Sequence, residues 1–456
     1  MPMIEIMAPV GNFACLTAAI QGGADSVYFG IGQLNMRSHS ANNFNAEDLP
    51  EVVRICRENG LKSYLTLNVI LYDNELEEAR RVLDSAKRAG VSAVIASDMA
   101  AVQYARSIGL EVHASTQLNV SNVEALRFWA QFCDVIVLAR ELTLEQVGAI
   151  HEAIEGEHIT GPSGELVRIE MFVHGALCMA VSGKCYLSLH AQGSSANRGA
   201  CYQICRRGYE VTDLETGQSL EIDNKYIMSP KDLCTIEFVD RIAAAGVQVF
   251  KIEGRARSAE YVKTCASCYR RAADAVCEGS FSPELASGLK TELATVFNRG
   301  FWDGYYQGAY LGEWSNVYGS QATERKVYVG KVSNWFDRIG VAEITVETVD
   351  LHRGDRLLAI GATTGAVEFM ASDLRVNFEA VDVAPKGSRC SVGVIPDQTP
   401  DQVGCDGYVI PGQTPDQVGG DGYVIPGPDR ESPDRPAASF DRLHRGDKIF
   451  IIFAET

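Results

Sequence analysis

The stretch EARRVLDSAKRAGVSAVIASD, residues 78–98, contains one complete helix-to-strand unit. Its first part places apolar side chains with a 3.6-residue period, which is typical of an amphipathic helix, and Gly90 is a suitable C-cap. A short apolar run follows at Ala93–Ala96, which predicts a buried strand, and the polar Ser97 and Asp98 end it. A helix followed by a short, wholly apolar strand is typical of a parallel α/β sheet.

The same alternation continues through the first 260 residues, with helix-like segments such as PEVVRICRENG between most of the apolar runs. The predicted strands are Glu5–Ala8, Ser26–Phe29, Ser63–Leu67, Ala93–Ala96, Glu111–Ala114, Val135–Leu138, Arg168–Val173 and Val249–Ile252. Eight strands with crossover helices favour a (β/α)₈ barrel over an open sheet. We therefore predict an α/β fold whose N-terminal domain resembles a TIM barrel.

Residues suited to a binding site follow most of these strands. In such barrels the active site lies at the C-terminal ends of the strands, because the loops there converge on one mouth. These residues are Pro9, Gly11, Gly30, Asn68, Ser97, Asp98, Ser115, Gln117, Arg140, Glu141, His174, Glu253 and Arg255. Any single one is also compatible with an ordinary turn, so the prediction depends on the whole set.

The pattern changes twice after the barrel. Residues 261–324 are predicted to form a helical extension, in which the aromatic run Trp302–Tyr310 indicates a docking surface. Strand patterns such as KVYVGKV and DKIFIIF then predict a small β-barrel over residues 325–456. The first domain is predicted to span residues 1–260 and to include a cysteine-rich loop at 174–224.

A tandem repeat interrupts the predicted C-terminal barrel. QTPDQVGCDGYVIPG (398–412) is followed directly by QTPDQVGGDGYVIPG (413–427). Two copies are too few for a solenoid, which needs at least three repeats to bury a continuous core. The Pro, Gly and Asp content of residues 396–436 instead predicts an exposed insertion, to which we assign no function.

Charge and composition exclude several classes of protein. The formal net charge of −18 argues against nucleic-acid binding over the whole surface, but it permits a local basic pocket. No signal peptide is evident, and no stretch approaches the ~20 apolar residues needed to span a bilayer. We therefore expect a cytoplasmic protein without a membrane partner. Thiols stay reduced in that compartment, so the 13 cysteines favour metal binding or chemistry over disulfides.

Four cysteines lie in one long segment with little periodicity. Residues 170–207 read EMFVHGALCMAVSGKCYLSLHAQGSSANRGACYQICRR, with cysteines at Cys178, Cys185, Cys201 and Cys205. Zinc sites usually have two C-x2-4-C knuckles, and here only the last pair is close. Iron–sulfur clusters are also held by four thiolates, at widely varying spacings. The spacing favours a metal site over free cysteines without choosing the metal.

A nucleophilic interpretation uses the same segment. His174 and Cys178 are four residues apart and would form a Cys–His pair, with Glu170 as the orienting group. Three companion cysteines would then have no explanation, and the chain has neither a GxSxG elbow nor an HExxH helix. The separate pair Cys265 and Cys268 lies on a predicted helix, where packing is the better explanation.

The run Glu170–Ser188, E-x-F-x-H-G-A-L-C-x6-C-x2-S, resembles the signature of the collagenase-like family U-32 peptidases. The similarity extends over about residues 3–330 and includes APVGN, GADSVYFG, STQLNVSN, LARELT and FKIEGRARS. SSANRGACYQICRRGYEV, with its C-x3-C, resembles the branch of tRNA-hydroxylation proteins that make 5-hydroxyuridine at the wobble base. Relatives hydroxylate ribosomal RNA or act in oxygen-independent ubiquinone synthesis. The predicted C-terminal β-barrel is also similar to one found in this family.

The resemblance implies a [4Fe–4S] cluster, because several relatives carry one on four cysteines of this region. Cys178, Cys185 and Cys201 match the three shared cysteines, and Cys205 matches the C-x3-C variant, with Cys234 as the competing fourth ligand. The implied function is prephenate-dependent hydroxylation of a tRNA wobble uridine to 5-hydroxyuridine. The implied partners are tRNA, in preference to rRNA, a small-molecule hydroxyl donor and an electron-donor protein.

The candidate site residues follow from this interpretation. The catalytic candidates are Glu170, His174, Lys251, Glu253 and Arg255, and the candidates for binding a cofactor or phosphate are Arg198, Arg206 and Arg207. Arg257 would add to the same electropositive pocket. Structural explanations remain open, since the arginines would also suit a solvated surface or pairs with the many acidic residues. Lys251 and Glu253 share one strand face and would suit an ion pair.

Two other classes of function stay open. One is a collagenase-like peptidase that uses Cys178 and His174, or a metal held by Glu170 and His174. The other is a non-catalytic iron–sulfur scaffold that binds a modifying enzyme.

Overall fold

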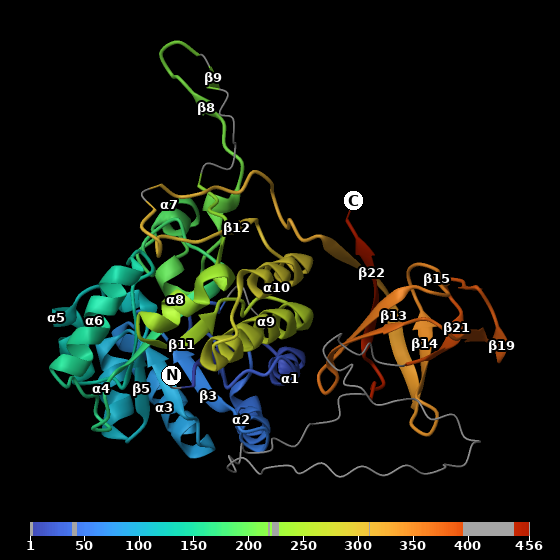
Figure 1. Ribbon diagram of the computed structural model, residues 1–456, viewed down its shortest axis with the longest axis horizontal. Coiled ribbons are helices and arrows are strands. Elements are labelled where there is room, and N and C mark those ends of the chain that lie inside the picture. Colours follow the sequence, from blue (N-terminus) through green and yellow to red (C-terminus); the bar gives the residue numbers. More distant parts are fainter. Residues whose placement is uncertain are drawn as a thin grey trace, which may run out of the picture.

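The computed structural model describes residues 3–38, 43–217, 219–220, 228–309, 311–394 and 442–455. The chain forms an N-terminal α/β barrel and a C-terminal unit of antiparallel sheets, which lie side by side (Figure 1). The tandem repeat and the whole of the predicted insertion at 396–436 lie outside the described residues.

Eight parallel strands close the barrel, in the order β11-β1-β2-β3-β4-β5-β6-β7, and β11 pairs with β7. The strands are β1 (Glu5–Pro9), β2 (Ser26–Phe29), β3 (Lys62–Leu67), β4 (Ala93–Ala96), β5 (Glu111–Ala114), β6 (Val135–Val137), β7 (Arg168–Ala176) and β11 (Val247–Ile252). Each corresponds to one predicted strand. The predicted fold class is confirmed, because short apolar runs bounded by turn residues mark buried parallel strands well.

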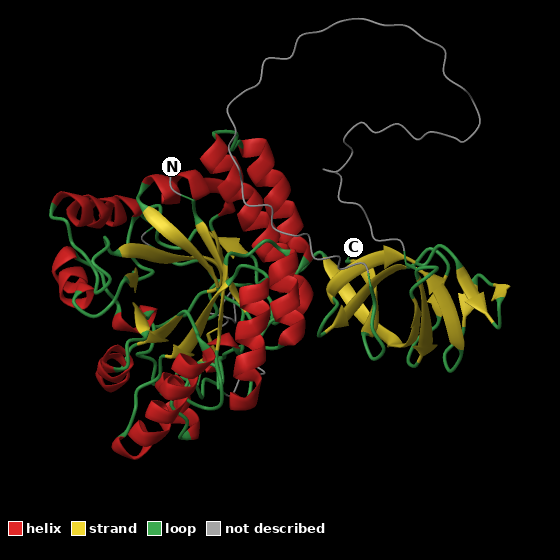
Figure 2. Cartoon of the chain, turned by 90° about the horizontal axis from the view of Figure 1, so that it is seen from below, coloured by secondary structure: helices red, strands yellow, loops and turns green. Residues whose placement is uncertain are grey.

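Helices surround the barrel strands (Figure 2). They are α1 (Phe13–Gln21), α2 (Leu49–Glu58), α3 (Leu76–Ala89), α4 (Met99–Ser107), α5 (Val123–Ala130), α6 (Leu144–Gly156), α8 (Val239–Ala244) and α9 (Ala259–Glu278). The side chains of Asn12, Asp98 and Asn122 accept hydrogen bonds from backbone N–H groups at three helix starts. Gly90 ends α3 with a φ of 81°, in the left-handed region that the predicted C-cap requires.

The segment after β7 covers the barrel mouth. It contains α7 (Leu187–Gln192), the 3₁₀ turns η4 (Ala196–Arg198) and η5 (Ile204–Arg206), and the hairpin β8 (Val211–Thr212) and β9 (Ser219–Leu220). Figure 1 shows that the hairpin projects away from the body. We call residues 177–209 the cap.

The boundary between β7 and the cap differs from the prediction. The predicted loop began at His174, but His174 lies inside β7, which continues to Ala176. The short strand β10 (Asp232–Cys234) pairs antiparallel with the end of β7, with Cys234 opposite His174. This pairing with a strand distant in sequence prolongs β7, and the local pattern of residues did not indicate it.

Helix α10 (Pro283–Thr295) and strand β12 (Phe301–Trp302) follow α9. The predicted docking surface at Trp302–Tyr310 is wrong for its described part, because Trp302 and Tyr306 are buried. The Tyr306 hydroxyl donates a 2.8 Å hydrogen bond to the Phe172 carbonyl of β7. These aromatic residues therefore pack against the barrel.

The C-terminal unit is antiparallel throughout. Its main sheet has the order β17-β16-β22-β13-β14-β21-β18-β19, and β15 pairs with β20 separately. The strands are β13 (Glu324–Phe336), β14 (Val341–Val346), β15 (Leu351–His352), β16 (Arg356–Gly361), β17 (Gly365–Met370), β18 (Leu374–Val376), β19 (Glu379–Ala380), β20 (Val383–Ala384), β21 (Arg389–Gly393) and β22 (Lys448–Ala454). The unit has its own apolar core.

Helix α1 joins the two units through polar contacts. The Gln21 amide donates to the Thr364 carbonyl at 2.9 Å and accepts from the Ala366 N–H at 3.0 Å. The Thr17 hydroxyl donates to the Ala362 carbonyl at 2.7 Å. Gly365, with a φ of +68°, leaves room for the Gln21 side chain. None of the helices within these described ranges is long and apolar enough to cross a membrane.

Candidate functional site

A cavity of about 210 Å³ lies at the C-terminal ends of the barrel strands. Its floor is formed by side chains at or just after strand ends, including Tyr28, Thr66, Asn68, Gln117 and Lys251. Its roof is formed by cap residues, because nearly every position from 177 to 187 contributes to the lining. The site therefore lies where the barrel fold predicted it.

All four cysteines of the cap line this cavity: Cys178, Cys185, Cys201 and Cys205. Cys178 is exposed and the other three are half-buried. Burial raises the pKa of the Cys205 thiol, the Arg206 charge lowers it, and the three other thiols raise it further. All four thiols therefore lie at the same cavity.

The two cysteines considered as the fourth ligand, Cys205 and Cys234, lie in different places. Cys234 is buried in β10, within the main apolar core, and does not line the cavity. Cys205 is thus the fourth thiol of the set. Cys265 and Cys268 are completely buried on α9, which confirms that this pair packs in the core.

The four thiols do not form the site of a single metal ion. Among the described residues, no group of three or more His, Cys, Asp or Glu side chains has an arrangement that could hold one ion. Sulfur atoms that share one tetrahedral ion with 2.3 Å bonds would lie only about 4 Å apart. A cluster binds each thiolate to a different iron, so it accepts a wider arrangement.

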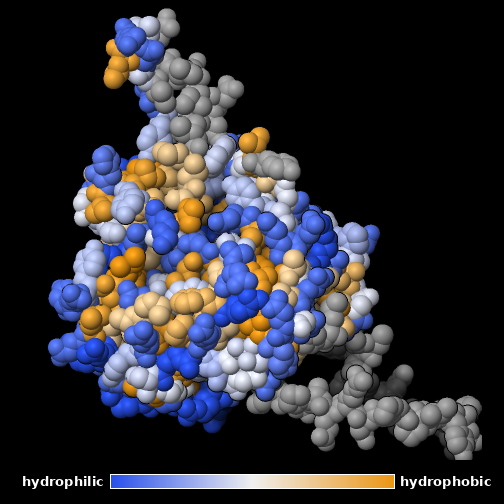
Figure 3. Space-filling view, turned by 90° about the vertical axis from the view of Figure 1, so that its left-hand side faces the viewer, coloured by the Kyte–Doolittle hydropathy of each residue, from blue (hydrophilic) through white to orange (hydrophobic). Residues whose placement is uncertain are grey.

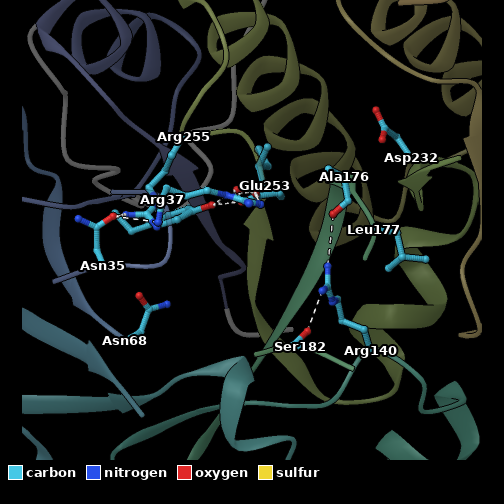
Figure 4. Close-up of polar contacts among 12 residues, drawn as sticks. Asn35, Arg37, Asn68, Arg140, Ala176, Leu177, Ser182, Asp232, Glu253 and Arg255 are labelled. Atoms are coloured by element: carbon cyan, nitrogen blue, oxygen red, sulfur yellow. Dashed lines mark hydrogen bonds and ion pairs between the residues drawn. The ribbon is translucent and has the colours of Figure 1, made fainter. Parts of the chain in front are cut away.

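Two arginines act on the Cys178 thiol. Although the residue as a whole is exposed, desolvation of its thiol in the cavity would by itself raise the pKa, but the charges of Arg140 and Arg37 lower the pKa below its ordinary value. Arg140 is held by hydrogen bonds to the Ser182 hydroxyl at 2.7 Å and the Ala176 carbonyl at 3.3 Å (Figure 4). The arrangement favours a thiolate, the form that binds metals and attacks electrophiles.

The cavity lining has seven cationic side chains and one carboxylate, Glu253. The cations are Arg37, Arg140, Arg206, Arg255, Arg257, Arg299 and Lys251. Three have acidic partners: Arg37 pairs with Glu253, Lys251 with Glu170 and Arg299 with Asp232. The other four have no carboxylate within ion-pair distance in the described part of the chain. They make the cavity attractive to an anion.

Arg255 is the most deeply buried of these four arginines, with 4% of its surface exposed. It donates to the Thr66 hydroxyl at 2.7 Å and to the side-chain amide oxygen of Asn35, Oδ1, at 3.1 Å. Burial lowers its pKa to about 10. Its charge therefore persists at neutral pH with uncharged hydrogen-bond partners.

Glu253 is held as an anion beside Arg255. Arg37 donates to one carboxylate oxygen, and the Tyr28 hydroxyl donates to the other at 3.1 Å (Figure 4). Burial would raise the pKa of Glu253, but the charge and hydrogen bonds of Arg37 outweigh it and lower the pKa to about 2. Glu253 therefore fixes Arg37 at the cavity wall.

Lys251 connects the cavity to the inside of the barrel. Its Nζ lies 2.5 Å from Glu170 Oε1, and both side chains are buried. The other Glu170 oxygen lies 3.9 Å from His113 Nδ1. Within the described structure neither of these two atoms has a hydrogen-bond partner. The ion pair that we considered between Lys251 and Glu253 is not formed, since each has a different partner.

His174 faces away from the cavity. Its ring contacts Tyr261, Tyr269 and Phe301, and its Nδ1 lies 3.5 Å from the Tyr269 hydroxyl. Burial lowers the pKa of His174 to about 3, so the ring is neutral.

A β-bulge explains this orientation. Lys251 pairs with Phe172, but the next residue of β11 pairs with His174, so β7 contains one extra residue there. The bulge reverses the alternation of faces along β7. Glu170 points into the barrel and His174 points toward α9, so the structure does not assemble the Cys178–His174–Glu170 arrangement or a metal site of Glu170 and His174.

The three predicted anion-binding arginines have different surroundings. Arg206 lines the cavity and donates to the Leu177 carbonyl at 2.8 Å and the Ser229 hydroxyl at 3.1 Å. Arg198 lies outside the cavity lining and pairs with Glu75, with its guanidinium 3.9 Å from the centre of the Tyr72 ring. Arg207 is exposed. The structural explanation that we left open therefore holds for Arg198.

Sequence reasoning missed Arg37 and Arg299. Arg37 lies in the loop after β2 and Arg299 just after α10, each as a single arginine without a motif. The loop position of Arg37 after a barrel strand was the one available signal. Arg140, Asn68 and Gln117 were predicted from that position and do line the cavity.

Comparison with known proteins identifies one family. The similar proteins carry two kinds of names, one for a collagenase and one for the hydroxylation of RNA. Residues 11–316 match "Peptidase family U32". A "Collagenase" of Porphyromonas gingivalis W83 is 58% identical over 390 residues, which cover 86% of this chain and 94% of that protein. The "tRNA hydroxylation protein P1" of Bacillus subtilis is 32% identical over 339 residues, covering 73% and 77%. The "23S rRNA 5-hydroxycytidine C2501 synthase" of Escherichia coli is 38% identical over 318 residues, covering 68% and 46%.

Proposed function

Because this chain belongs to peptidase family U32, we propose that it is an RNA-modifying enzyme that hydroxylates a pyrimidine base. The family predicted from the sequence is confirmed. The observation that carries the proposal is the cavity, where four thiols lie beside four arginines that have no acidic partner among the described residues. The finer proposal is hydroxylation of a tRNA wobble uridine to 5-hydroxyuridine.

The thiols fit a [4Fe–4S] cluster held by Cys178, Cys185, Cys201 and Cys205. Four thiolates are the donor set that such a cluster takes, and all four cysteines line one cavity. When bound, such a cluster supplies one-electron transfer. The neighbouring Arg37, Arg140 and Arg206 would offset the negative charge of the thiolates.

The barrel side of the cavity suits an anionic small molecule. Arg255 and Arg257 lack carboxylate partners in the described ranges and would bind carboxylate groups by charge-assisted hydrogen bonds. Hydroxylation replaces a C–H bond of the base by C–OH, so a donor R–OH that leaves as R–H balances the reaction. We propose prephenate as this donor. An electron-donor protein would maintain the redox state of the site.

Other polar residues at the cavity mouth are suited to binding a nucleobase. Asn68 and Gln117 line the cavity with amide groups that both donate and accept hydrogen bonds. Lys251 also lines the cavity, where its ammonium would hold or donate a proton next to the reacting base. The target base must leave its stack to reach these groups, as is general for enzymes that act on bases.

A gene deletion tests the proposal. Nucleosides from tRNA and rRNA of the deletion strain are measured by mass spectrometry, and one hydroxylated pyrimidine is expected to disappear. The wild-type gene and Cys268→Ser should restore it, because Cys268 packs in the core, and Cys201→Ser should not. Unchanged nucleosides in both RNA pools would contradict the proposal.

A collagenase-like peptidase is the second candidate. It is favoured by the 58% identical relative named "Collagenase" and by the lowered pKa of the Cys178 thiol. The structure places His174 on the other side of β7, so His174 does not serve this candidate as the general base beside Cys178. Cleavage of gelatin by the wild type, lost in Cys178→Ala, would favour it.

A further inference from the structure

The cap differs in charge from the chain as a whole. The chain has 59 Asp and Glu residues and a net charge of −18, but no Asp or Glu occurs from Met171 to Tyr209. The same stretch contains Lys184, Arg198 and two further arginines. Arg198 pairs with Glu75 and Arg206 lines the cavity, so Lys184 and Arg207 are the exposed basic side chains of the cap. With no carboxylate of its own, the cap is a locally basic surface on an acidic protein, which suits a polyanionic partner.

Two tyrosines of the cap are displayed to solvent. Tyr186 is 68% exposed and Tyr202 is 53% exposed, although each directly neighbours a cavity cysteine. A 3.0 Å hydrogen bond from the Tyr202 backbone N–H to the Ser188 hydroxyl ties the two segments together. Neither phenol ring packs against another ring or makes a hydrogen bond within the described chain. Their positions are thus fixed by the backbone while their faces remain open.

Apolar side chains complete this surface. Met179, Val181, Leu187 and Leu189 belong to the cap and are each at least 36% exposed, although the first three also line the cavity. Figure 3 shows apolar side chains, in orange, gathered beneath the projecting β8–β9 hairpin. Exposed apolar and aromatic groups that lie together on a soluble protein indicate an interaction site.

We propose that the outer surface of the cap, centred on Tyr186 and Tyr202, docks a single-stranded RNA loop by stacking its bases; this inference rests on the proposed function. Aromatic faces accept any unstacked base, and basic side chains nearby follow the phosphates. A duplex would not present its bases to these rings. The cavity lies directly beneath the cap, so a loop held there brings one base close to the four thiols.

The test uses a fluorescently labelled RNA stem–loop and a fully paired duplex of the same composition. Tyr186→Ala and Tyr202→Ala should each weaken stem–loop binding by about fivefold or more, as expected when one stacked base is lost. Tyr186→Phe and Tyr202→Phe keep the ring and should bind like the wild type. Phe378→Ala is the matched control, because Phe378 is 94% exposed on the C-terminal unit. The duplex should bind more weakly than the stem–loop.

The outcomes separate this inference from the proposed function. If the wild type binds the stem–loop and both alanine variants bind equally well, the docking surface is elsewhere and the proposed function stands. If the wild type binds neither RNA at low salt, the proposed function fails as well. Binding of a collagen-like peptide that is lost in Tyr186→Ala, without RNA binding, would assign the surface to a polypeptide and overturn the inference. Circular dichroism confirms that each variant is folded.

Discussion

Replacing Lys251 by Met should strongly destabilise the barrel. The change leaves the Glu170 carboxylate, which has no exposed surface, without the ammonium that lies 2.5 Å away. His113, at 3.9 Å, is too distant to replace that hydrogen bond. Removing one partner of a buried ion pair typically costs about 3–5 kcal/mol, because a charge remains buried and uncompensated.

Thermal unfolding followed by circular dichroism measures this effect. For a large domain the loss corresponds to a fall in Tm of roughly 6–20 °C. The double variant Lys251→Met with Glu170→Leu should recover most of the loss, because it removes both charges together. Arg54→Met is the surface control, since Arg54 pairs with Glu58 in solvent and should show no clear change. A Tm for Lys251→Met within about 2 °C of the wild type would refute the reasoning.

Three further predictions concern the thiols, the buried histidine and the contact between units. Anaerobically purified protein should be brown with about four iron per chain; Cys185→Ser should lose the iron and Cys268→Ser should keep it, and one zinc in colourless protein would contradict this. Burial lowers the pKa of His174 to about 3 in the folded chain, so between pH 6.5 and 3 the unfolded chain binds one more proton than the folded chain. The free energy of unfolding should therefore fall by roughly 1.4 kcal/mol per pH unit as the pH drops through this range, and His174→Phe should lessen this slope in denaturant titrations. Gly365→Ala should lower the Tm of the C-terminal unit, because its Cβ would lie 2.3 Å from Gln21 Oε1 at a φ of +68°; an unchanged Tm and unchanged protease resistance between the units would contradict this.

The strands of the barrel were predictable because each depends on its own residues. A run such as Ala93–Ala96 is apolar at every position, since both of its faces are buried in a parallel sheet. The positions just after the strands were also informative, and Asn68, Gln117 and Arg140 all line the cavity. The same rule also predicted residues that do not line the cavity, namely Pro9, Gly11, Gly30, Ser97, Asp98, Glu141 and His174. Position after a strand therefore located the site but did not select its members.

The orientation of His174 was not predictable in this way. Simple alternation along β7 places Glu170 and His174 on one face, and a bulge opposite β11 moves them to opposite faces. The bulge depends on pairing with residues about 80 positions away along the chain. The choice between Cys205 and Cys234 had the same origin, because β10 pairs with β7 and so buries Cys234 in the core.

The separation of the three cap arginines also depends on distant residues. Arg198 pairs with Glu75 from the segment between β3 and α3, which is 123 residues away in the sequence. Arg37 approaches Glu253 over 216 residues. The sequence therefore predicted that a basic pocket would form, but it did not predict which arginines would line that pocket.

The most direct test of the central claim is the reaction with purified protein. Anaerobically purified enzyme is incubated with tRNA from the deletion strain, prephenate and a chemical reductant, and the nucleosides are analysed by mass spectrometry. We predict that one uridine gains the mass of one oxygen atom with the wild type and with Cys268→Ser, but not with Cys201→Ser. No gain in either tRNA or rRNA, with gelatin cleavage by the same preparation that Cys178→Ala abolishes, would contradict the account.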